Sequence, residues 1–106
     1  MSRFMRVIVM FDLPVKQRRE RAAAARFRKF LLDDGFYMLQ YSVYARPCNG
    51  YDGAAAHIAR VRERVPPRGS VRCLTITERQ YARIELMAGA PSPQELAADP
   101  APLQVL

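Results

Sequence analysis

One carboxylate, Asp12, stands where an apolar run of the sequence ends and a strongly basic segment begins. Residues 7–11 (VIVMF) have the β-branched, unbroken hydrophobic character of a strand buried on both faces. Pro14 stops this strand, because proline has no N–H for a sheet ladder. A carboxylate at the rim of a sheet can bind a hard cation such as Mg²⁺. The alternative is structural, with Asp12 starting the turn and capping the segment that follows.

A single aspartate is a poor metal site, but two copies of Asp12 meeting across a dimer axis would supply two carboxylate ligands. No other acidic residue has a comparable place in the sequence. The remaining candidates lie at predicted helix ends, where solvation or capping accounts for them: Asp33, Asp34 and Asp52. The metal hypothesis therefore depends on Asp12 and on dimerisation.

Basic residues dominate the charge, with 17 Lys and Arg against 10 Asp and Glu, a formal net charge of +7. Seven of them lie between residues 16 and 29, a stretch whose only acid is Glu20. Like charges repel at helical spacing, so a polyanionic partner is expected, and nucleic acid is the usual one. Phosphate contacts of this kind give affinity without sequence specificity. The candidate contacts are Arg18, Arg19, Arg21 and Arg26.

The sequence argues against a membrane role and for a cytoplasmic protein. The basic helix lacks a large aromatic face, and no run approaches the roughly 20 apolar residues of a membrane span. Arg3 and Arg6 interrupt the first apolar run, which has no small-residue cleavage site. Cys48 and Cys73, with one histidine, make neither a disulfide framework nor a zinc site. His57 is predicted to flank a helix stripe, and Cys48 has no activating partner.

The hydrophobic pattern predicts strands and helices in an alternating order. Gly35 is expected to end the first helix, and turn formers predict a loop after the aromatic segment. The expected elements are a strand at 5–12, a helix at 16–34, one long strand or two joined strands at 36–46 with a bend near 40–42, a loop at 47–53, a helix at 53–65, a strand at 70–77 and a further strand at 83–88.

This order is that of an α+β, ferredoxin-like βαββαβ domain, with an additional C-terminal strand. Both helices would cover one face of an antiparallel sheet, leaving the other face bare and favouring a homodimer. The aromatic residues expected to need cover are Tyr37, Tyr41 and Tyr44. Of these, Tyr41 and Tyr44, together with Ser42, either pack in a core or interface or stack on bases. The strand at 83–88 would reach toward a second subunit's sheet edge.

The domain is expected to span residues 1–89, and residues 90–106 form a tail rich in Pro and Ala. Within the tail, residues 92–95 (SPQE) have the form of a helix-capping box, so one or two helical turns are expected there. The rest of the tail is predicted to be mobile or to dock on a partner.

Taken together, three segments resemble CRISPR-associated protein 2, the small subunit of the spacer-acquisition machinery. They are FDLP (residues 11–14), FLLDDG (30–35) and GFYMLQYSVY (35–44). The segment at 66–81 (PPRGSVRCLTITERQY) resembles members from type II systems in particular. The resemblance covers about residues 5–89. Each motif alone is weak, but the combination is specific.

The resemblance implies a ferredoxin-like homodimer whose first-strand aspartates face each other. In many members these aspartates carry a Mg²⁺- or Mn²⁺-dependent endonuclease (phosphodiesterase) activity on RNA or DNA. The resemblance assigns this role to Asp12, with the ion shared across the dimer. The family's basic residues after that strand match Arg19 and Arg21, next to Arg18. Its polar turn in the strand pair matches Gln40 and Ser42, the latter a candidate nucleic-acid contact. Met38 replaces a basic residue of many nuclease-active relatives.

The family also implies a role without cleavage, in which the dimer bridges two dimers of the CRISPR adaptation integrase and holds duplex DNA. The expected partners are therefore a second copy of the chain, the integrase subunit, double-stranded DNA and single-stranded RNA, with no membrane. The alternatives are a non-catalytic duplex-binding scaffold, a toxin-type messenger-RNA ribonuclease and a single-strand RNA-binding module of the same topology.

Overall fold

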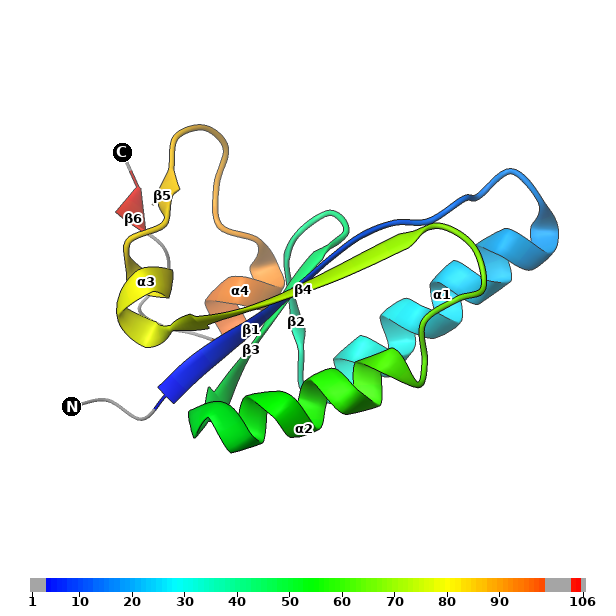
Figure 1. Ribbon diagram of the computed structural model, residues 1–106. Coiled ribbons are helices and arrows are strands. Elements are labelled where there is room, and N and C mark those ends of the chain that lie inside the picture. The colour runs from blue at the N-terminus through cyan, green and yellow to red at the C-terminus, as the bar shows by residue number, and fades with distance from the viewer. Residues whose placement is uncertain (1–3, 99–103, 106) are drawn as a thin grey trace.

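The computed structural model describes residues 4–98 and 104–105, and its centre is a four-stranded antiparallel sheet (Figure 1). The strands lie in the order β2-β3-β1-β4, so the first strand is central. Their bounds are Phe4–Asp12 for β1, Tyr37–Gln40 for β2, Val43–Asn49 for β3 and Ser70–Thr77 for β4. This order and the two connecting helices confirm the ferredoxin-like βαββαβ prediction.

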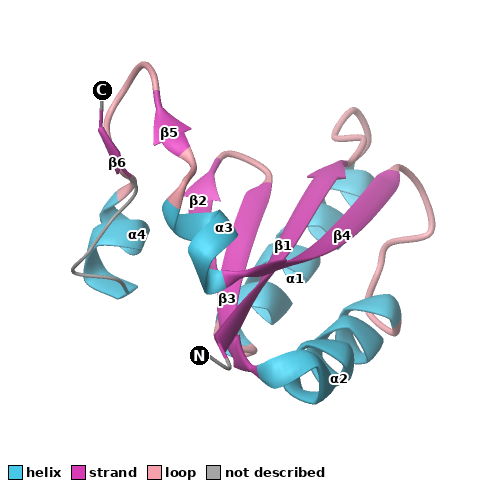
Figure 2. Ribbon diagram, turned by 60° about the vertical axis from the view of Figure 1, so that its left-hand side comes forward, coloured by secondary structure: helices cyan, strands magenta, loops and turns pink. Residues whose placement is uncertain are grey.

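Helices α1 (Arg18–Asp33) and α2 (Gly50–Arg62) pack on the same face of the sheet, which we call the helix face (Figures 1 and 2). The helix α1 ends as predicted, with Gly35 at a φ of +95°. No helix in residues 4–98 is long and apolar enough to cross a membrane.

Alternation along β1 divides the sheet into two packed faces. Val7, Val9 and Phe11 point to the helix face and pack with Phe27 and Leu31 of α1. Phe11 meets the Phe27 ring edge-on at 5.2 Å between centroids. Each such buried side chain contributes about 1.5–3 kcal/mol to the free energy of folding. Both faces of β1 are buried, which explains its unbroken hydrophobic run.

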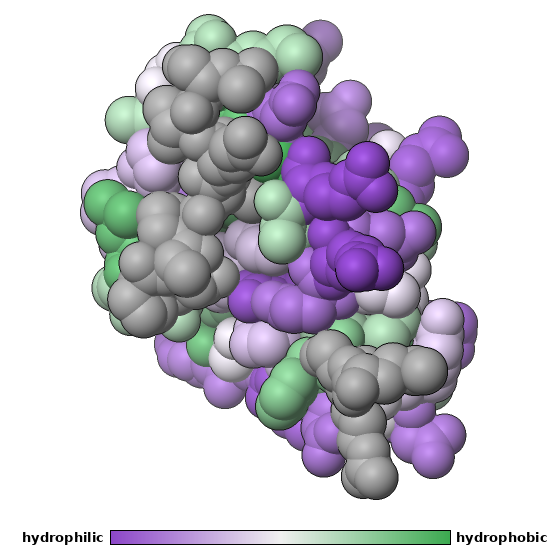
Figure 3. All heavy atoms as spheres, turned by 90° about the vertical axis from the view of Figure 1, so that its left-hand side faces the viewer, coloured by the Kyte–Doolittle hydropathy of each residue, from purple (hydrophilic) through white to green (hydrophobic). Residues whose placement is uncertain are grey.

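The opposite face, which we call the second face, is covered at one end by the short helix α3 (Glu78–Ala82). There Arg6 is buried and donates to both carboxylate oxygens of Glu78, with Nε to Oε2 at 2.9 Å. It also donates to the Tyr37 hydroxyl at 2.7 Å and lies over the Tyr81 ring. Burial and the hydrogen bond with Tyr37 raise the pKa of Tyr81, which therefore keeps its proton. Viewed from this end, hydrophilic side chains gather in the middle of the surface (Figure 3).

Four sequence predictions need correction. The loop predicted at 47–53 is wrong, because β3 continues to Asn49 and α2 begins at Gly50. The pairing of Asn49 with Phe4 and of Cys48 with Met5 holds these turn formers in the sheet. The second helix accordingly ends at Arg62 rather than near residue 65.

The third correction concerns the tyrosines expected on the bare face. Tyr44 is buried on the helix face, where its ring stacks on Phe11 at 5.7 Å. Tyr37 is buried on the second face, as expected, but Tyr81 already covers it. Tyr41 is 75% exposed at the turn between β2 and β3. The second face is therefore less bare than the sequence indicates.

The C-terminal segment returns to the sheet and forms α4 (Pro93–Ala98). The predicted capping box is confirmed, because Ser92 Oγ accepts the Glu95 N–H at 3.0 Å. The Gln94 side chain accepts the Met38 N–H at 2.7 Å, so α4 covers the free edge of β2. The strand predicted at 83–88 is reduced to β5 (Glu85–Leu86), which pairs in parallel with β6 (Gln104–Val105). The mobile-tail prediction otherwise falls on residues 99–103 and 106, outside the described part.

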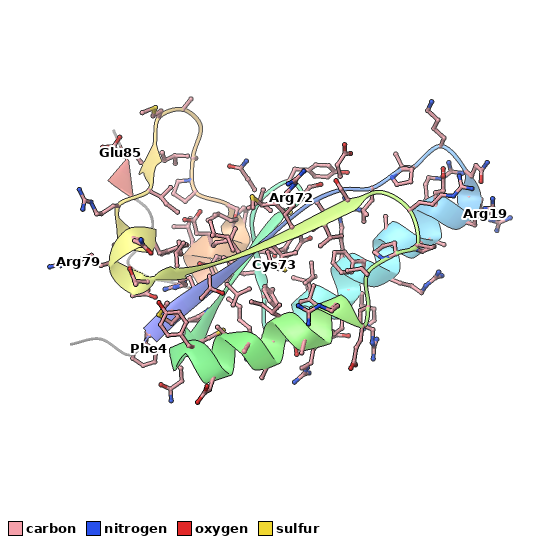
Figure 4. All side chains as sticks on the ribbon, viewed as in Figure 1. Phe4, Arg19, Arg72, Cys73, Arg79 and Glu85 are labelled. Atoms are coloured by element: carbon pink, nitrogen blue, oxygen red, sulfur yellow. The ribbon has the colours of Figure 1, made fainter. Side chains whose placement is uncertain are left out.

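Replacing Glu78 by Ala is expected to destabilise the protein by about 3 kcal/mol, because it deprives the buried Arg6 guanidinium of this carboxylate. Urea unfolding would measure the loss. The matched control is Glu85→Ala, because Glu85 is exposed (Figure 4) and its loss should change stability by less than about 0.5 kcal/mol. Equal midpoints for the two variants would contradict the structural role of the Arg6–Glu78 pair.

Candidate nucleic-acid interface

Asp12 is the last residue of β1 and pairs across the sheet with Ser70, the first residue of β4. Alternation places it on the second face with Ile8 and Met10. Its side chain is exposed, and no hydrogen bond or ion pair engages it within the described chain. It therefore does not cap α1, whose N-cap is Gln17.

The backbone around Asp12 is held from two sides. The Phe11 N–H donates to the Ser42 carbonyl at 3.0 Å, which fixes the turn between β2 and β3 against the end of β1. On the other side Gly69 has a φ of +94°, and a Cβ there would lie 2.5 Å from the Asp12 carbonyl oxygen. Only glycine allows this approach. The backbone of Asp12 is thus fixed while its carboxylate stays available.

Arg28 is part of this rim, although the sequence prediction passed over it. Its guanidinium lies over the rings of Phe11 at 5.4 Å and Tyr41 at 5.0 Å, and Nη2 donates to Ser42 Oγ at 3.5 Å. Ser42 has a φ of +64° and its side chain is half-buried. The candidate contact Ser42 therefore lies in the turn beside Asp12 and also has a structural role. No local sequence pattern predicts this turn or the stacking on these rings. The sequence therefore could not single out Arg28 among the arginines of α1.

The arginines of α1 divide into available and engaged side chains. Arg18 and Arg26 are exposed, and no contact within the described chain engages their guanidinium groups. Arg19 donates only to its neighbour Gln17 at 3.0 Å and points away from the protein body (Figure 4). Arg21 instead donates to the backbone carbonyls of Val15 at 3.1 Å and Lys16 at 2.8 Å. Arg21 therefore holds the loop before α1, whereas the other three present charge to solvent.

The other candidate groups of the sequence serve the interior of the fold. The buried Asp34 carboxylate pairs with Arg60 and with His57 Nδ1 at 2.8 Å, so His57 is a half-buried helix residue, as predicted. Burial raises the pKa of the Cys48 thiol, which makes it a poor nucleophile. Across residues 4–98 and 104–105, no three His, Cys, Asp or Glu side chains cluster to hold a metal ion. At this rim, one described chain thus offers a cation a single carboxylate, that of Asp12.

The fold and this rim define a ferredoxin-like α+β domain with an available strand-end aspartate and an arginine-rich first helix. Residues 5–84 match the family described as CRISPR associated protein Cas2, and the chain belongs to that family.

Relatives that carry the name CRISPR-associated endoribonuclease Cas2 cover most of the chain. The protein of Acidovorax ebreus (strain TPSY) is 50% identical over 91 residues, 86% of this chain and 89% of its own. That of Parvibaculum lavamentivorans is 52% identical over 83 residues, 78% of this chain and 82% of its own. The Campylobacter jejuni protein is 46% identical over 88 residues, 83% of this chain and 62% of its own.

Replacing Gly69 by Ala is expected to displace the Asp12 carbonyl and cost about 3 kcal/mol, because strain at positive φ adds to a backbone clash. The control is Gly89→Ala, since Gly89 has a φ of +87° but nothing within 4 Å of an added Cβ. That variant should lose only about 1 kcal/mol. Denaturant unfolding compares them, and equal losses would contradict the close approach at Asp12.

Proposed function

We propose that this chain is the CRISPR adaptation subunit of its family and acts as a homodimeric, metal-dependent endonuclease on nucleic acid. The observation that carries the proposal is the available carboxylate of Asp12, on a fixed backbone at the end of the strand that leads into the basic helix α1. The endoribonuclease names of the relatives support cleavage of phosphodiester bonds. Family membership favours this role over a toxin-type ribonuclease.

The second face supports pairing of two copies. Beyond the part that α3 covers, it carries apolar side chains that are only partly buried, among them Met10 and Val43. Leu74 of the edge strand β4 is 50% exposed on the same face. Asp12 lies on this face too, so a symmetric contact through it would bring the two carboxylates together.

The residues at this site suit Mg²⁺ or Mn²⁺, which take oxygen ligands and are often held by one or two carboxylates with water and phosphate oxygens. When bound, such an ion would stabilise the charge on the scissile phosphate and would make a water bound to it more acidic. The chain's own part is to hold two Asp12 carboxylates at a fixed place. Arg18, Arg19 and Arg26 then bind the flanking phosphates, and binding should weaken as salt rises.

A second role is supported by a separate observation: the solvent-facing arginines of α1 do not contact Asp12 in any described interaction. They can hold double-stranded DNA whether or not cleavage takes place. We propose that the dimer also bridges the adaptation integrase through this duplex and through its C-terminal segment. In this role the protein is a scaffold, and Asp12 is dispensable.

Replacing Asp12 by Asn should lower metal-dependent cleavage of RNA or DNA by at least about 100-fold, because the amide removes an anionic metal ligand. Cleavage with and without Mg²⁺ measures this effect, and spacer acquisition in cells measures the biological role. Asp52→Asn is the matched control, since Asp52 is exposed at the start of α2. Unchanged cleavage by Asp12→Asn would refute the catalytic proposal. Lost cleavage with intact acquisition would leave the scaffold role.

Replacing Leu74 by Glu should convert the dimer to monomers, because it places a charge in the proposed interface. Sedimentation at matched concentrations gives the oligomeric state. Leu32→Glu is the control, because Leu32 is 44% exposed on α1, away from the second face. A variant Leu74→Glu that remains dimeric would exclude the second face as the interface.

A further inference from the structure

We infer that a groove along α1 binds the single-stranded continuation of a nucleic acid whose phosphate lies at Asp12. This inference rests on the proposed function and names the form of its substrate: flexible single strand in addition to duplex. The groove, here called the α1 groove, lies between α1 and the connection from α2 to β4.

The α1 groove consists of two adjoining depressions of about 360 and 280 Å³. They share Ala23 and Arg26 on α1 and the dipeptide Pro66–Pro67 on the opposite wall, so they adjoin along the helix. The first depression begins at Leu13, directly after Asp12. The Asp12 side chain lies on the second face, so a strand leaving it reaches the groove around this end of β1.

The walls carry the charge that phosphates need. Arg19, Arg26 and Arg68 line the first depression, and Arg64 lines the second. Each depression also has one acid, and the one in the first, Glu20, already accepts the Gln17 N–H at 2.8 Å. The first depression thus has three arginines against one acid. This excess of positive charge favours an anionic occupant over a neutral one.

The spacing of the basic residues fits a nucleotide repeat. Arg19 and Arg26 are seven residues apart on α1, which separates them by about 10 Å along the helix axis. A stacked strand advances about 3.4 Å per nucleotide, so these two arginines are about three nucleotides apart. One strand can thus meet both while its intervening nucleotides lie on the apolar floor.

The floor favours single strands over duplex. Leu13, Ala23 and Pro66 offer flat apolar contact for sugars and bases, and unpaired bases can also stack on guanidinium planes. Arg64 Cζ lies 5.1 Å from the centre of the Phe30 ring and the side chain is exposed, so its guanidinium is available beside this floor. A duplex keeps its bases paired and stacked inside, so it can offer this floor only sugars and phosphates.

The experiment compares wild type with the double variant Arg64→Ala, Arg68→Ala on three probes at several salt concentrations: a single-stranded 12-mer, a hairpin with a 6-nucleotide overhang, and the same hairpin with a blunt end. Binding of the first two should weaken about 5- to 10-fold, and their salt slope should fall by about 1.4, or about 0.7 per lost contact. Blunt-hairpin affinity should stay within about 2-fold. Arg79→Ala, Arg83→Ala is the control, because both arginines are exposed at the opposite end of the molecule, where Figure 4 labels Arg79.

Equal losses on the overhang and blunt hairpins would overturn the inference, because the α1 groove would then be ordinary duplex-binding surface. Unchanged binding of all three probes by the double variant would overturn it as well. A decaglutamate peptide that competes as well as the 12-mer would do the same, showing a site for charge alone, as for an acidic protein partner. If wild type binds none of the probes, the proposed function fails instead, so the two failures are distinguishable.

Discussion

The function proposed for this chain depends on a fixed backbone beneath a free side chain at the end of β1. The Ser42 carbonyl holds the Phe11 N–H on one side, and Gly69 lies against the Asp12 carbonyl on the other. Because β1 is the central strand, with Val7 and Val9 fully buried, this end cannot shift without disturbing both faces of the sheet. A carboxylate on so rigid a support is positioned before any ligand arrives, which lowers the cost of binding.

Much of this arrangement could be predicted from the sequence because it is encoded locally. The unbroken apolar run before Asp12 and the proline after it define a buried strand and its end. The helical spacing of the apolar residues that include Phe27 and Leu31 defines α1 and its buried face. The alternation of such elements then leaves few topologies, and the ferredoxin-like order is one of them. The rim position of Asp12 follows from these patterns alone.

What the sequence could not indicate depends on contacts between distant residues. Asn49 and Gly50 are turn formers, yet pairing with the far end of β1 keeps Asn49 in a strand. Tyr37 and Tyr44 look alike in sequence, but a register shift between β2 and β3 and the alternation of each strand send them to opposite faces. Similarly, nothing local distinguishes Arg21, which holds backbone carbonyls, from Arg18, which is available to a partner.

Arg6 and Asp12 share one face of β1, and in the proposed dimer their different surroundings would couple pairing to cation binding. Arg6 is buried with Glu78 under α3, whereas Asp12 is open. In the proposed dimer two Asp12 carboxylates 4 Å apart would repel by about 1 kcal/mol in water and about 4 kcal/mol at an effective dielectric constant of 20. Burying the exposed halves of the two Leu74 side chains contributes about 2 kcal/mol in total, which lies within the same range. A cation between the carboxylates would remove this repulsion and stabilise the proposed dimer, and dimerisation would raise cation affinity by the same factor.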